Sequence, residues 1–333
     1  MGRPGNRNST GYRSIFRAHS FVLAKKQYVK KGTEFCECCI FIKILNMKKL
    51  AIALGGGGAR GLAHVGFLRV IEREKIPIAR ISGCSMGAMV GGAYALYESA
   101  EAVEELAFHF IQHPDFEAFN FDDFAAMDNP GDDLKSKAYA VMGRIKVGLS
   151  LFKTLANPGI YEEELVEKIY SNYPDHAIEK LPISFSAMTS DLVTGEEVLL
   201  TKGSLRLAIR ASSSIPGYLP PVKWGKYLLV DGGVSNLVPT QYFKDVKHEL
   251  IVGVDVSRSI RAKTDLKSGV DIMQRAENIR NYHLTQLKVS NADKVVRCEL
   301  GNTSWADFKQ ADDIMKAGEK TAEQLLPWLE KNL

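Results

Sequence analysis

A serine flanked by glycines stands where a strand is expected to give way to a helix. The pentapeptide Gly83–Gly87 reads Gly-Cys-Ser-Met-Gly, a G-x-S-x-G sequence with Ser85 at its centre. In that context the serine sits on a sharp, strained turn with its hydroxyl exposed, and larger side chains in place of the glycines would collide across the turn. The dipole of the following helix favours negative charge developing beside the serine. Ser85 is therefore a candidate nucleophile; the alternative is a glycine-rich turn whose serine caps a helix.

A second motif, Gly55–Gly61, lies between the first expected strand and its helix and reads Gly-Gly-Gly-Gly-Ala-Arg-Gly. Consecutive glycines let backbone N–H groups converge on an anion without obstruction by side chains. Gly56, Gly58 and Gly61 also satisfy the G-x-G-x-x-G dinucleotide fingerprint. That fingerprint requires an acidic residue at the end of the second strand. No acid is available there, because Ser82 and then the serine turn follow that strand.

The remaining interpretation of the glycine-rich loop is an oxyanion hole. A P-loop is excluded because no Gly-Lys-Ser/Thr follows the glycines. The expected donors are the backbone N–H groups of Gly57 and Gly58, with Arg60 holding the loop or assisting. Donors aimed at a tetrahedral intermediate contribute roughly 3–4 kcal/mol each, by analogy with one measured case.

A carboxylate follows an apolar strand further along the chain. The tripeptide Asp231-Gly232-Gly233 comes directly after the expected strand Tyr227–Val230. This position puts the Asp231 carboxylate in a tight turn at the carboxyl edge of the sheet, where ligands bind in open α/β sheets. Taken alone, the motif is more typical of a β-turn that uses Asp and Gly for its geometry.

No histidine completes a Ser-His-Asp triad convincingly. An α/β-hydrolase order would place the histidine late in the chain, but His248 and His283 lie in an expected surface loop and an expected helix, without a turn motif. His64 falls on the first helix and is expected to be a packed structural residue. A Ser–Asp dyad fits better, in which Asp231 accepts the proton of Ser85 directly and later serves the attacking water.

The elements that must position these groups alternate between strand and helix. Leu50–Leu54 is a continuous apolar run, as in a buried parallel strand, and Arg60–Glu74 carries apolar residues at helical spacing. Ile78–Ile81 and Ser85–Tyr97 repeat the pattern as strand and helix. This order predicts a largely parallel sheet covered by helices on both faces.

The rest of the chain continues as one α/β domain. Five more strands are expected, at 183–188, 197–201, 227–230, 250–256 and 294–300. Helices are expected over 161–173, 270–289 and 307–331, with a helical insertion near 110–160. Six phenylalanines between 108 and 124 could line an acyl channel or belong to the core of that insertion.

Composition is that of an ordinary globular protein, with the basic charge at one end. Of 333 residues, 45% are hydrophobic and 25% charged. The sequence contains no run of 18 uncharged apolar residues, so no transmembrane helix is expected. Residues 1–46 carry nine Lys or Arg and two Glu, a net charge of +7. Because the whole chain has a net charge of +4, residues 47–333 have a net charge of −3. A nucleic-acid footprint on the folded part is therefore not supported.

Residues 1–46 are expected to be a basic, disordered extension, or not to belong to the native chain. Their apolar stretch at 35–45 is too short to cross a bilayer and lacks a small-residue cleavage site. A basic tether to a membrane surface is the functional alternative. The three cysteines at 36–39 have no second Cys or His pair nearby, so a metal site is not expected, and the odd number of cysteines favours a reducing compartment.

Together and in this order, the three motifs resemble those of the patatin-like phospholipase family. That family has a glycine-rich oxyanion loop followed by Arg or Lys, then G-x-S-x-G, then D-G-G or D-G-A. Ala211–Pro221 is similar to the family's Ser- and Pro-rich segment, and Thr189–Glu196 to its central strand-turn signature. The resemblance covers about residues 48–245, and the C-terminal helices are similar to those of bacterial single-domain members.

The resemblance implies a patatin-like three-layer α/β fold and a serine acyl hydrolase with a Ser–Asp dyad, no metal and no cofactor. By position, Ser85 is the nucleophile and Asp231 the general base. The implied oxyanion site consists of Gly56, Gly57, Gly58 and Arg60. The supporting motif glycines are Gly61, Gly83, Gly87, Gly232 and Gly233.

The expected reaction is cleavage of fatty-acyl esters, of phospholipase, lysophospholipase or esterase type, through an acyl-enzyme. Residues 47–245 are the expected catalytic domain, and 246–333 supply a strand and helices that complete it. The expected location is cytoplasmic, with peripheral contact to a membrane surface as an option; no nucleic-acid partner is expected and the oligomeric state stays open. The alternative is a weakly catalytic regulatory or binding protein on the same fold.

Overall fold

The computed structural model describes residues 48–119, 121, 154–243, 249–260, 266 and 269–333. The expectations for residues 1–46, for Phe124 and for most of the helical insertion lie outside the described residues.

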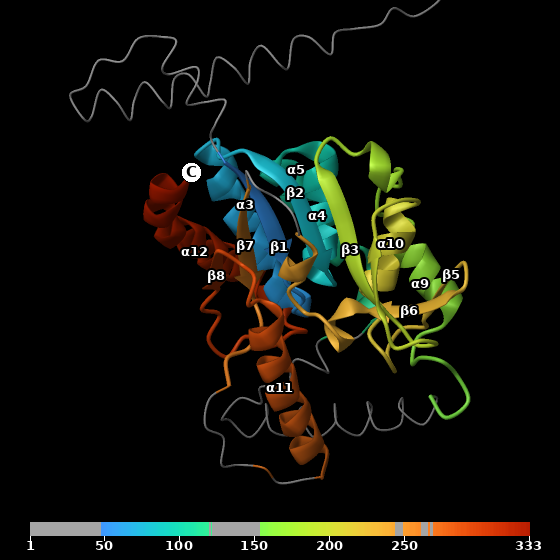
Figure 1. The fold of residues 1–333 in the computed structure, drawn as a ribbon. Coiled ribbons are helices and arrows are strands. Elements are labelled where there is room, and N and C mark those ends of the chain that lie inside the picture. The colour runs from blue at the N-terminus through green and yellow to red at the C-terminus, as the bar shows by residue number, and fades with distance from the viewer. Residues whose placement is uncertain (1–47, 120, 122–153, 244–248, 261–265, 267–268) are drawn as a thin grey trace, which may run out of the picture.

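A sheet of eight strands forms the middle layer of the described part (Figure 1), in the order β5-β6-β3-β2-β1-β7-β8, with β4 paired to β3. The strands are β1 Lys49–Leu54, β2 Ile78–Cys84, β3 Ser184–Asp191, β4 Glu197–Leu200, β5 Val222–Trp224, β6 Tyr227–Asp231, β7 Glu249–Asp255 and β8 Lys294–Arg297. The run β3-β2-β1-β7-β8 is parallel, whereas β4, β5 and β6 add antiparallel pairings beyond it. The predicted, mostly parallel sheet is confirmed.

The position of β1 inside the sheet follows from its sequence. Its last five residues, Leu50–Leu54, are completely buried, because side chains on both faces are covered. β1 pairs in parallel with β2 on one side and β7 on the other. A strand covered on both faces must be apolar throughout, which is the pattern that identified it.

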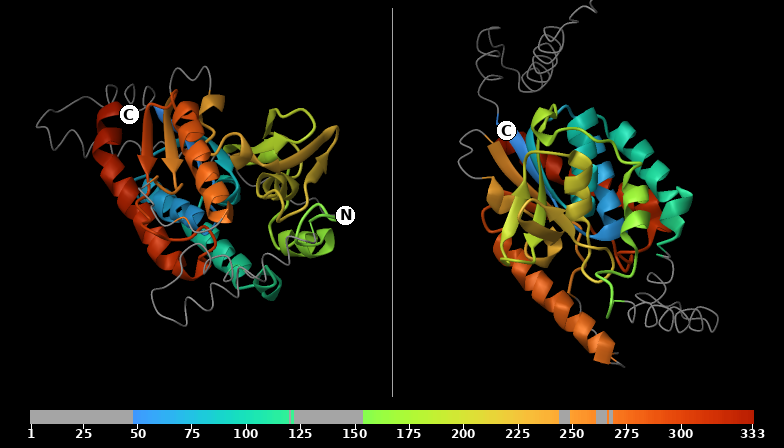
Figure 2. Two further views of the ribbon diagram at one scale, coloured as in Figure 1. Left: turned by 90° about the horizontal axis from the view of Figure 1, so that it is seen from below. Right: turned by 90° about the vertical axis from the view of Figure 1, so that its right-hand side faces the viewer.

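Helices cover both faces of the sheet, which makes the three-layer α/β architecture (Figure 2). The helices are α3 Ala63–Arg73, α4 Met86–Tyr97, α5 Ala100–Ile111, α6 Pro114–Glu117, α9 Glu163–Tyr170, α10 Leu205–Ser212, α11 Gly269–Lys288 and α12 Ala311–Asn332. On one face α3, α4 and α12 bury the main core. On the other, Val238, Phe243 and Val289 pack over Ala51 and Ala53 of β1.

Two elements at the site differ from the sequence-based expectation. The helix expected from Arg60 begins as a 3-10 turn, η1 (Gly58–Leu62), and α3 starts only at Ala63. Helix α10 was not expected, although Ser204 caps it by accepting a hydrogen bond from the Leu207 N–H at 3.0 Å. The helix was missed because the serines that follow it are typical of a loop.

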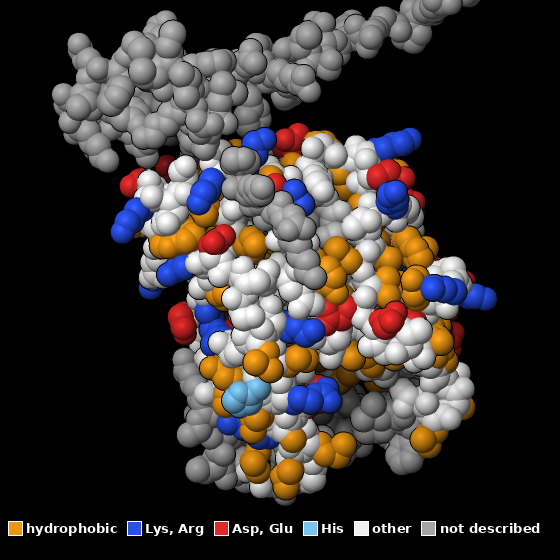
Figure 3. Space-filling model, viewed as in Figure 1, with side chains coloured by type: hydrophobic (Ala, Val, Ile, Leu, Met, Phe, Trp, Pro, Cys, Tyr) orange, Lys and Arg blue, Asp and Glu red, His pale blue; other side chains and the backbone are white. Residues whose placement is uncertain are grey.

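Helix α11 extends beyond the carboxyl edge of the sheet (Figures 1 and 2). Its exposed side chains include Ile272, Met273 and Ile279, and Figure 3 shows apolar side chains over its lower part. Among the helices that the structure describes, none combines the length and the apolar character needed to cross a membrane.

Helices α3 and α12 approach closely through two glycines. A Cβ on Gly66 of α3 would lie 1.9 Å from the Met315 carbonyl oxygen, and a Cβ on Gly318 of α12 would lie 1.8 Å from that of Ala63. Because α3 follows directly on the glycine-rich loop, the C-terminal helix supports the element that carries this loop.

We expect Gly318→Ala to lower the free energy of unfolding by about 1–3 kcal/mol, because the added methyl group forces α12 away from α3. Urea or thermal unfolding measures the change. The matched control is Lys316→Ala, since the Lys316 side chain is mostly exposed on the same helix. Equal stability of Gly318→Ala and the wild type would contradict this packing.

Candidate active site

Ser85 occupies the sharp junction between β2, which ends at Cys84, and α4, which begins at Met86. Its backbone has φ 52° and ψ −122°, a strained conformation for a residue with a side chain. A Cβ on Gly83 would lie 2.4 Å from the Gly87 carbonyl oxygen, and one on Gly87 would lie 2.1 Å from that of Leu54. Both flanking positions therefore require glycine, as the motif predicts.

Asp231 is the last residue of β6 and lies opposite Thr189 of β3. On the other side of β3, Met188 pairs with Cys84, the residue before Ser85. β3 thus brings together two segments that are far apart in the sequence. The Ser85 hydroxyl lies close enough to the Asp231 carboxylate to lower its pKa, and both residues are buried.

The Asp231 carboxylate is buried, and hydrogen bonds offset part of the cost of burying its charge. Burial raises its pKa above the ordinary value for aspartate, while hydrogen bonds from the Ser85 hydroxyl, the Gly233 amide and the Cys84 thiol oppose the rise. The Gly233 N–H lies 2.7 Å from Oδ1 and the Cys84 Sγ 3.6 Å from the same oxygen. The carboxylate is therefore a stronger base than an exposed aspartate, and it is held in one orientation.

Two serines, the last residue of α10 and one just beyond it, hold the backbone of both residues. The Ser212 hydroxyl accepts a hydrogen bond from the Ser85 N–H at 2.9 Å and donates one to the Met188 carbonyl at 2.7 Å. The Ser214 carbonyl accepts from the Asp231 N–H at 2.9 Å. The Ser-rich stretch gave a signal for this role, but no pattern in the sequence showed which serine contacts which residue.

The glycine-rich loop lies beside Ser85. A Cβ on Gly56 would be 3.3 Å from the Ser85 Cβ. The Gly56 N–H already donates to the Leu237 carbonyl at 3.0 Å, so it is not free to bind an oxyanion. By contrast, the N–H groups of Gly57 and Gly58 donate to no other residue in the described part of the chain.

Arg60 and His64 tie this loop to the sheet. The buried Arg60 guanidinium donates to the Val256 carbonyl, just beyond the end of β7. His64 Nε2 lies 2.8 Å from the Gly55 carbonyl oxygen, and burial lowers the pKa of the imidazole to about 4. Because a carbonyl can only accept, the neutral ring must carry its proton on Nε2. The prediction that His64 is packed in the interior is confirmed, but its bond to the loop was not foreseen.

At the other motif glycines, the backbone packs closely against neighbouring residues of the site. A Cβ on Gly61 would lie 2.5 Å from the Met86 side chain, and one on Gly232 would lie 2.4 Å from the Met188 carbonyl oxygen. The N–H of Gly233 serves the Asp231 carboxylate. The three motifs thus converge at the carboxyl edge of the sheet.

The phenylalanines after α4 form a cluster of edge-on and tilted ring contacts. Phe110, Phe116 and Phe119 are buried, whereas Phe108 and Phe121 are partly exposed. Ring centroids of Phe116 and Phe119 are 5.8 Å apart, and those of Phe116 and Phe121 are 5.1 Å apart. The buried members therefore belong to the core.

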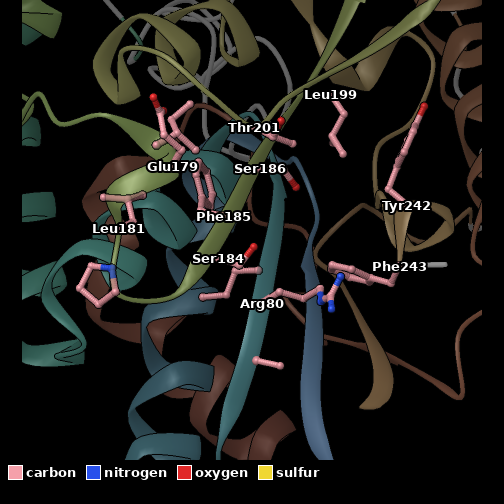
Figure 4. Close-up of a pocket in the computed structure, with 14 residues that line it drawn as sticks. Arg80, Glu179, Leu181, Ser184, Phe185, Ser186, Leu199, Thr201, Tyr242 and Phe243 are labelled. Atoms are coloured by element: carbon pink, nitrogen blue, oxygen red, sulfur yellow. The ribbon is translucent and has the colours of Figure 1, made fainter. Parts of the chain in front are cut away.

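A cavity of about 520 Å³ lies at the opposite, amino edge of the strands (Figure 4). It is lined by Arg80 at the start of β2, by Ser184 and Phe185 at the start of β3, and by Tyr242 and Phe243. Arg80 is paired with Glu249 at 2.9 Å. This cavity is separate from Ser85, which follows the other end of β2. Within the described ranges, no group of three or more His, Cys, Asp or Glu residues could hold a metal ion.

Comparison with protein families gives one matching family model, described as patatin-like phospholipase, over residues 52–244. An uncharacterized NTE family protein of Mycobacterium bovis is 32% identical over 213 residues, which cover 64% of this chain and 31% of that protein. Another, of Mycobacterium tuberculosis, is 31% identical over 63% of this chain and 50% of its own length. The chain therefore spans about a third to a half of the length of these relatives.

More distant likenesses extend over more of the chain. Patatin-like phospholipase domain-containing protein 6 of Mus musculus is 25% identical over 248 residues, 74% of this chain and 16% of that protein. Among solved structures, VipD from Legionella pneumophila aligns with a TM-score of 0.47 at 16% identity, covering 86% of this chain and 67% of that chain.

We expect Asp231→Asn to be at least as stable as the wild type at neutral pH. A carboxyl group whose pKa is raised by folding loses stabilising free energy as the pH rises from its unfolded pKa to its folded pKa, by about 1.4 kcal/mol for each pH unit between the two values. The uncharged variant has no such loss. Urea unfolding from pH 3 to pH 8 tests this, since the advantage of Asp231→Asn should grow as the pH rises through that window and then level off. A variant that becomes relatively less stable with rising pH would contradict the raised pKa.

Proposed function

The chain belongs to the patatin-like phospholipase family, and we propose that it is a lipid acyl hydrolase that cleaves fatty-acyl esters with Ser85 as nucleophile and Asp231 as general base. Members of this family act on lipids, which supports a lipid substrate. The observation that supports the residue assignment is that β3 brings the Ser85 hydroxyl next to the buried Asp231 carboxylate, close enough to affect its pKa.

Acylation begins when Ser85 Oγ attacks the ester carbonyl carbon and Asp231 takes the hydroxyl proton. The carbonyl oxygen becomes an oxyanion, which accepts hydrogen bonds from the N–H groups of Gly57 and Gly58. The amino end of α4 adds a favourable dipole. When the tetrahedral intermediate collapses, the leaving alcohol takes the proton from Asp231, and the acyl group stays on Ser85.

Deacylation repeats the sequence with water. Asp231 accepts a proton from the water as its oxygen attacks the acyl carbon, and the same N–H groups hold the second oxyanion. Ser85 then leaves with the proton from Asp231, and the fatty acid is released. Asp231 thus carries the proton in each of the two half-reactions.

The environment of Asp231 suits this role. A carboxylate with an ordinary pKa is a weak base toward a serine hydroxyl, and burial makes it stronger. Hydrogen bonds from the Gly233 amide and the Cys84 thiol favour its ionised form and hold the side chain in one orientation. The raised pKa also means that activity should fall on the acid side as Asp231 becomes protonated.

We expect Ser85→Ala to reduce ester hydrolysis by at least about a thousandfold while leaving the fold intact, since the nucleophile is removed from an otherwise unchanged turn. Hydrolysis of p-nitrophenyl esters and of lysophospholipid, measured with circular dichroism as a check on folding, tests this. The matched control is Ser184→Ala, an exposed serine at the other edge of the sheet. Undiminished hydrolysis by Ser85→Ala would falsify the assignment, and absence of hydrolysis by the wild type would favour a regulatory or binding protein.

We expect His64 to act as a positioning residue for the glycine-rich loop. The amide nitrogen of Gln can replace Nε2 of His, whereas that of Asn is too short to reach the Gly55 carbonyl. His64→Asn should therefore lower kcat about tenfold with little change in KM, because the Gly57 and Gly58 donors lose their alignment. His64→Gln should restore most of kcat. Equal kcat for the Asn and Gln variants, at equal stability, would show that His64 only fills space.

A further inference from the structure

We propose that Trp305 and Tyr218 form the surface on which the acyl chain of the substrate lies, next to the glycine-rich loop. The inference rests on the proposed function, because it assigns the part of the protein that selects acyl length. Trp305 lies outside residues 52–244, so it is not a position of the matching family model.

Trp305 is in direct contact with the loop. A Cβ on Gly58 would lie 2.2 Å from the Trp305 carbonyl oxygen and 3.2 Å from Cε3 of its indole ring. The same carbonyl accepts a hydrogen bond from the Ala59 N–H at 2.7 Å. Gly58 has φ +57°, so this close approach depends on a glycine in a left-handed conformation. The indole ring is therefore fixed beside one of the two free loop donors.

The loop limits how far this ring can lie from the nucleophile. Gly56, two residues before Gly58, lies against Ser85, with 3.3 Å between the Ser85 Cβ and the position of a Gly56 Cβ. Since neighbouring Cα atoms are about 3.8 Å apart, the indole ring lies no further than about 17 Å from the Ser85 Cβ. A fatty-acyl chain on Ser85 is long enough to reach a ring within that distance, and a short acyl group offers far fewer methylene groups to contact it.

Tyr218 contacts Trp305 and belongs to the segment that holds Asp231. It follows Ser214, whose carbonyl holds the Asp231 N–H, by four residues. The Tyr218 and Trp305 rings meet edge to face, with centroids 5.8 Å apart at 75°. Both side chains are partly exposed. Two aromatic rings from separate segments thus meet beside the glycine-rich loop, and both are partly exposed.

Further aromatic rings pack against Trp305 and connect it to the core. The Phe121 ring lies 6.1 Å from that of Trp305 and 5.0 Å from that of Phe308. Phe116, which is buried, contacts both Phe121 and Phe308. Packing of this kind keeps the outer rings in place, so that an apolar chain can bind them without first ordering them. An acyl chain that covers the rings removes their remaining apolar surface from water.

The test compares p-nitrophenyl dodecanoate with p-nitrophenyl butyrate. We expect Trp305→Ala to lower kcat/KM for the dodecanoate about tenfold relative to the butyrate, since several methylene groups lose an apolar partner. Trp305→Phe should retain most of the preference. Tyr218→Ala, a change on an independent segment, should reduce the preference in the same direction. The matched control is Trp328→Ala, because Trp328 packs against the core near the C-terminal end of α12.

The outcomes separate this inference from the function on which it rests. A folded Trp305→Ala or Tyr218→Ala variant with the wild-type ratio of the two esters would overturn the acyl surface while leaving the hydrolase intact. Should Trp305→Ala fail to fold, the ratio measured for Tyr218→Ala and Trp305→Phe decides the question. If the wild-type protein cleaves neither ester, the proposed function itself is wrong. A loss of preference in Trp328→Ala equal to that in Trp305→Ala would also contradict the proposal.

Discussion

The proposed site depends on one constraint: a serine hydroxyl and a buried carboxylate from distant segments must lie close enough, across one strand, to share a proton. β3 supplies this geometry, because it pairs with the strand that ends before Ser85 and with the strand that ends at Asp231. β6 runs antiparallel to β3 and ends opposite Thr189, so Asp231 lies at the same edge of the sheet as the carboxyl end of β2. A sheet that was parallel throughout would need a crossover to deliver this residue, whereas a short antiparallel strand delivers it directly.

The surroundings of the pair balance two opposing requirements. Burial makes the carboxylate more basic, and hydrogen bonds from Cys84 and Gly233 keep it oriented. The backbone of each partner is held by a serine of the same segment, Ser212 or Ser214. Strain at Ser85 is maintained because β2, α4 and this segment are all packed in the core.

Sequence patterns indicated the sheet and the position of Ser85 well, because buried strands are continuously apolar and a strand-to-helix turn requires glycines. They did not reveal that the Gly56 amide is already bonded to Leu237, or that His64 holds the Gly55 carbonyl. These contacts join residues whose types are common in any core, so no spacing rule identifies them. Asp231 was ambiguous for the same reason: a turn carboxylate has a function only through the partner that the fold gives it.

The most direct test of the Ser85–Asp231 pair is the rate at which a fluorophosphonate modifies the protein, followed by mass spectrometry as a function of pH. The account predicts a single adduct on Ser85, with a rate that rises through one pKa above that of ordinary aspartate, and a slow rate without this titration in Asp231→Asn. Modification at another residue, or an unchanged pH profile in Asp231→Asn, would contradict the pairing of this serine with this carboxylate.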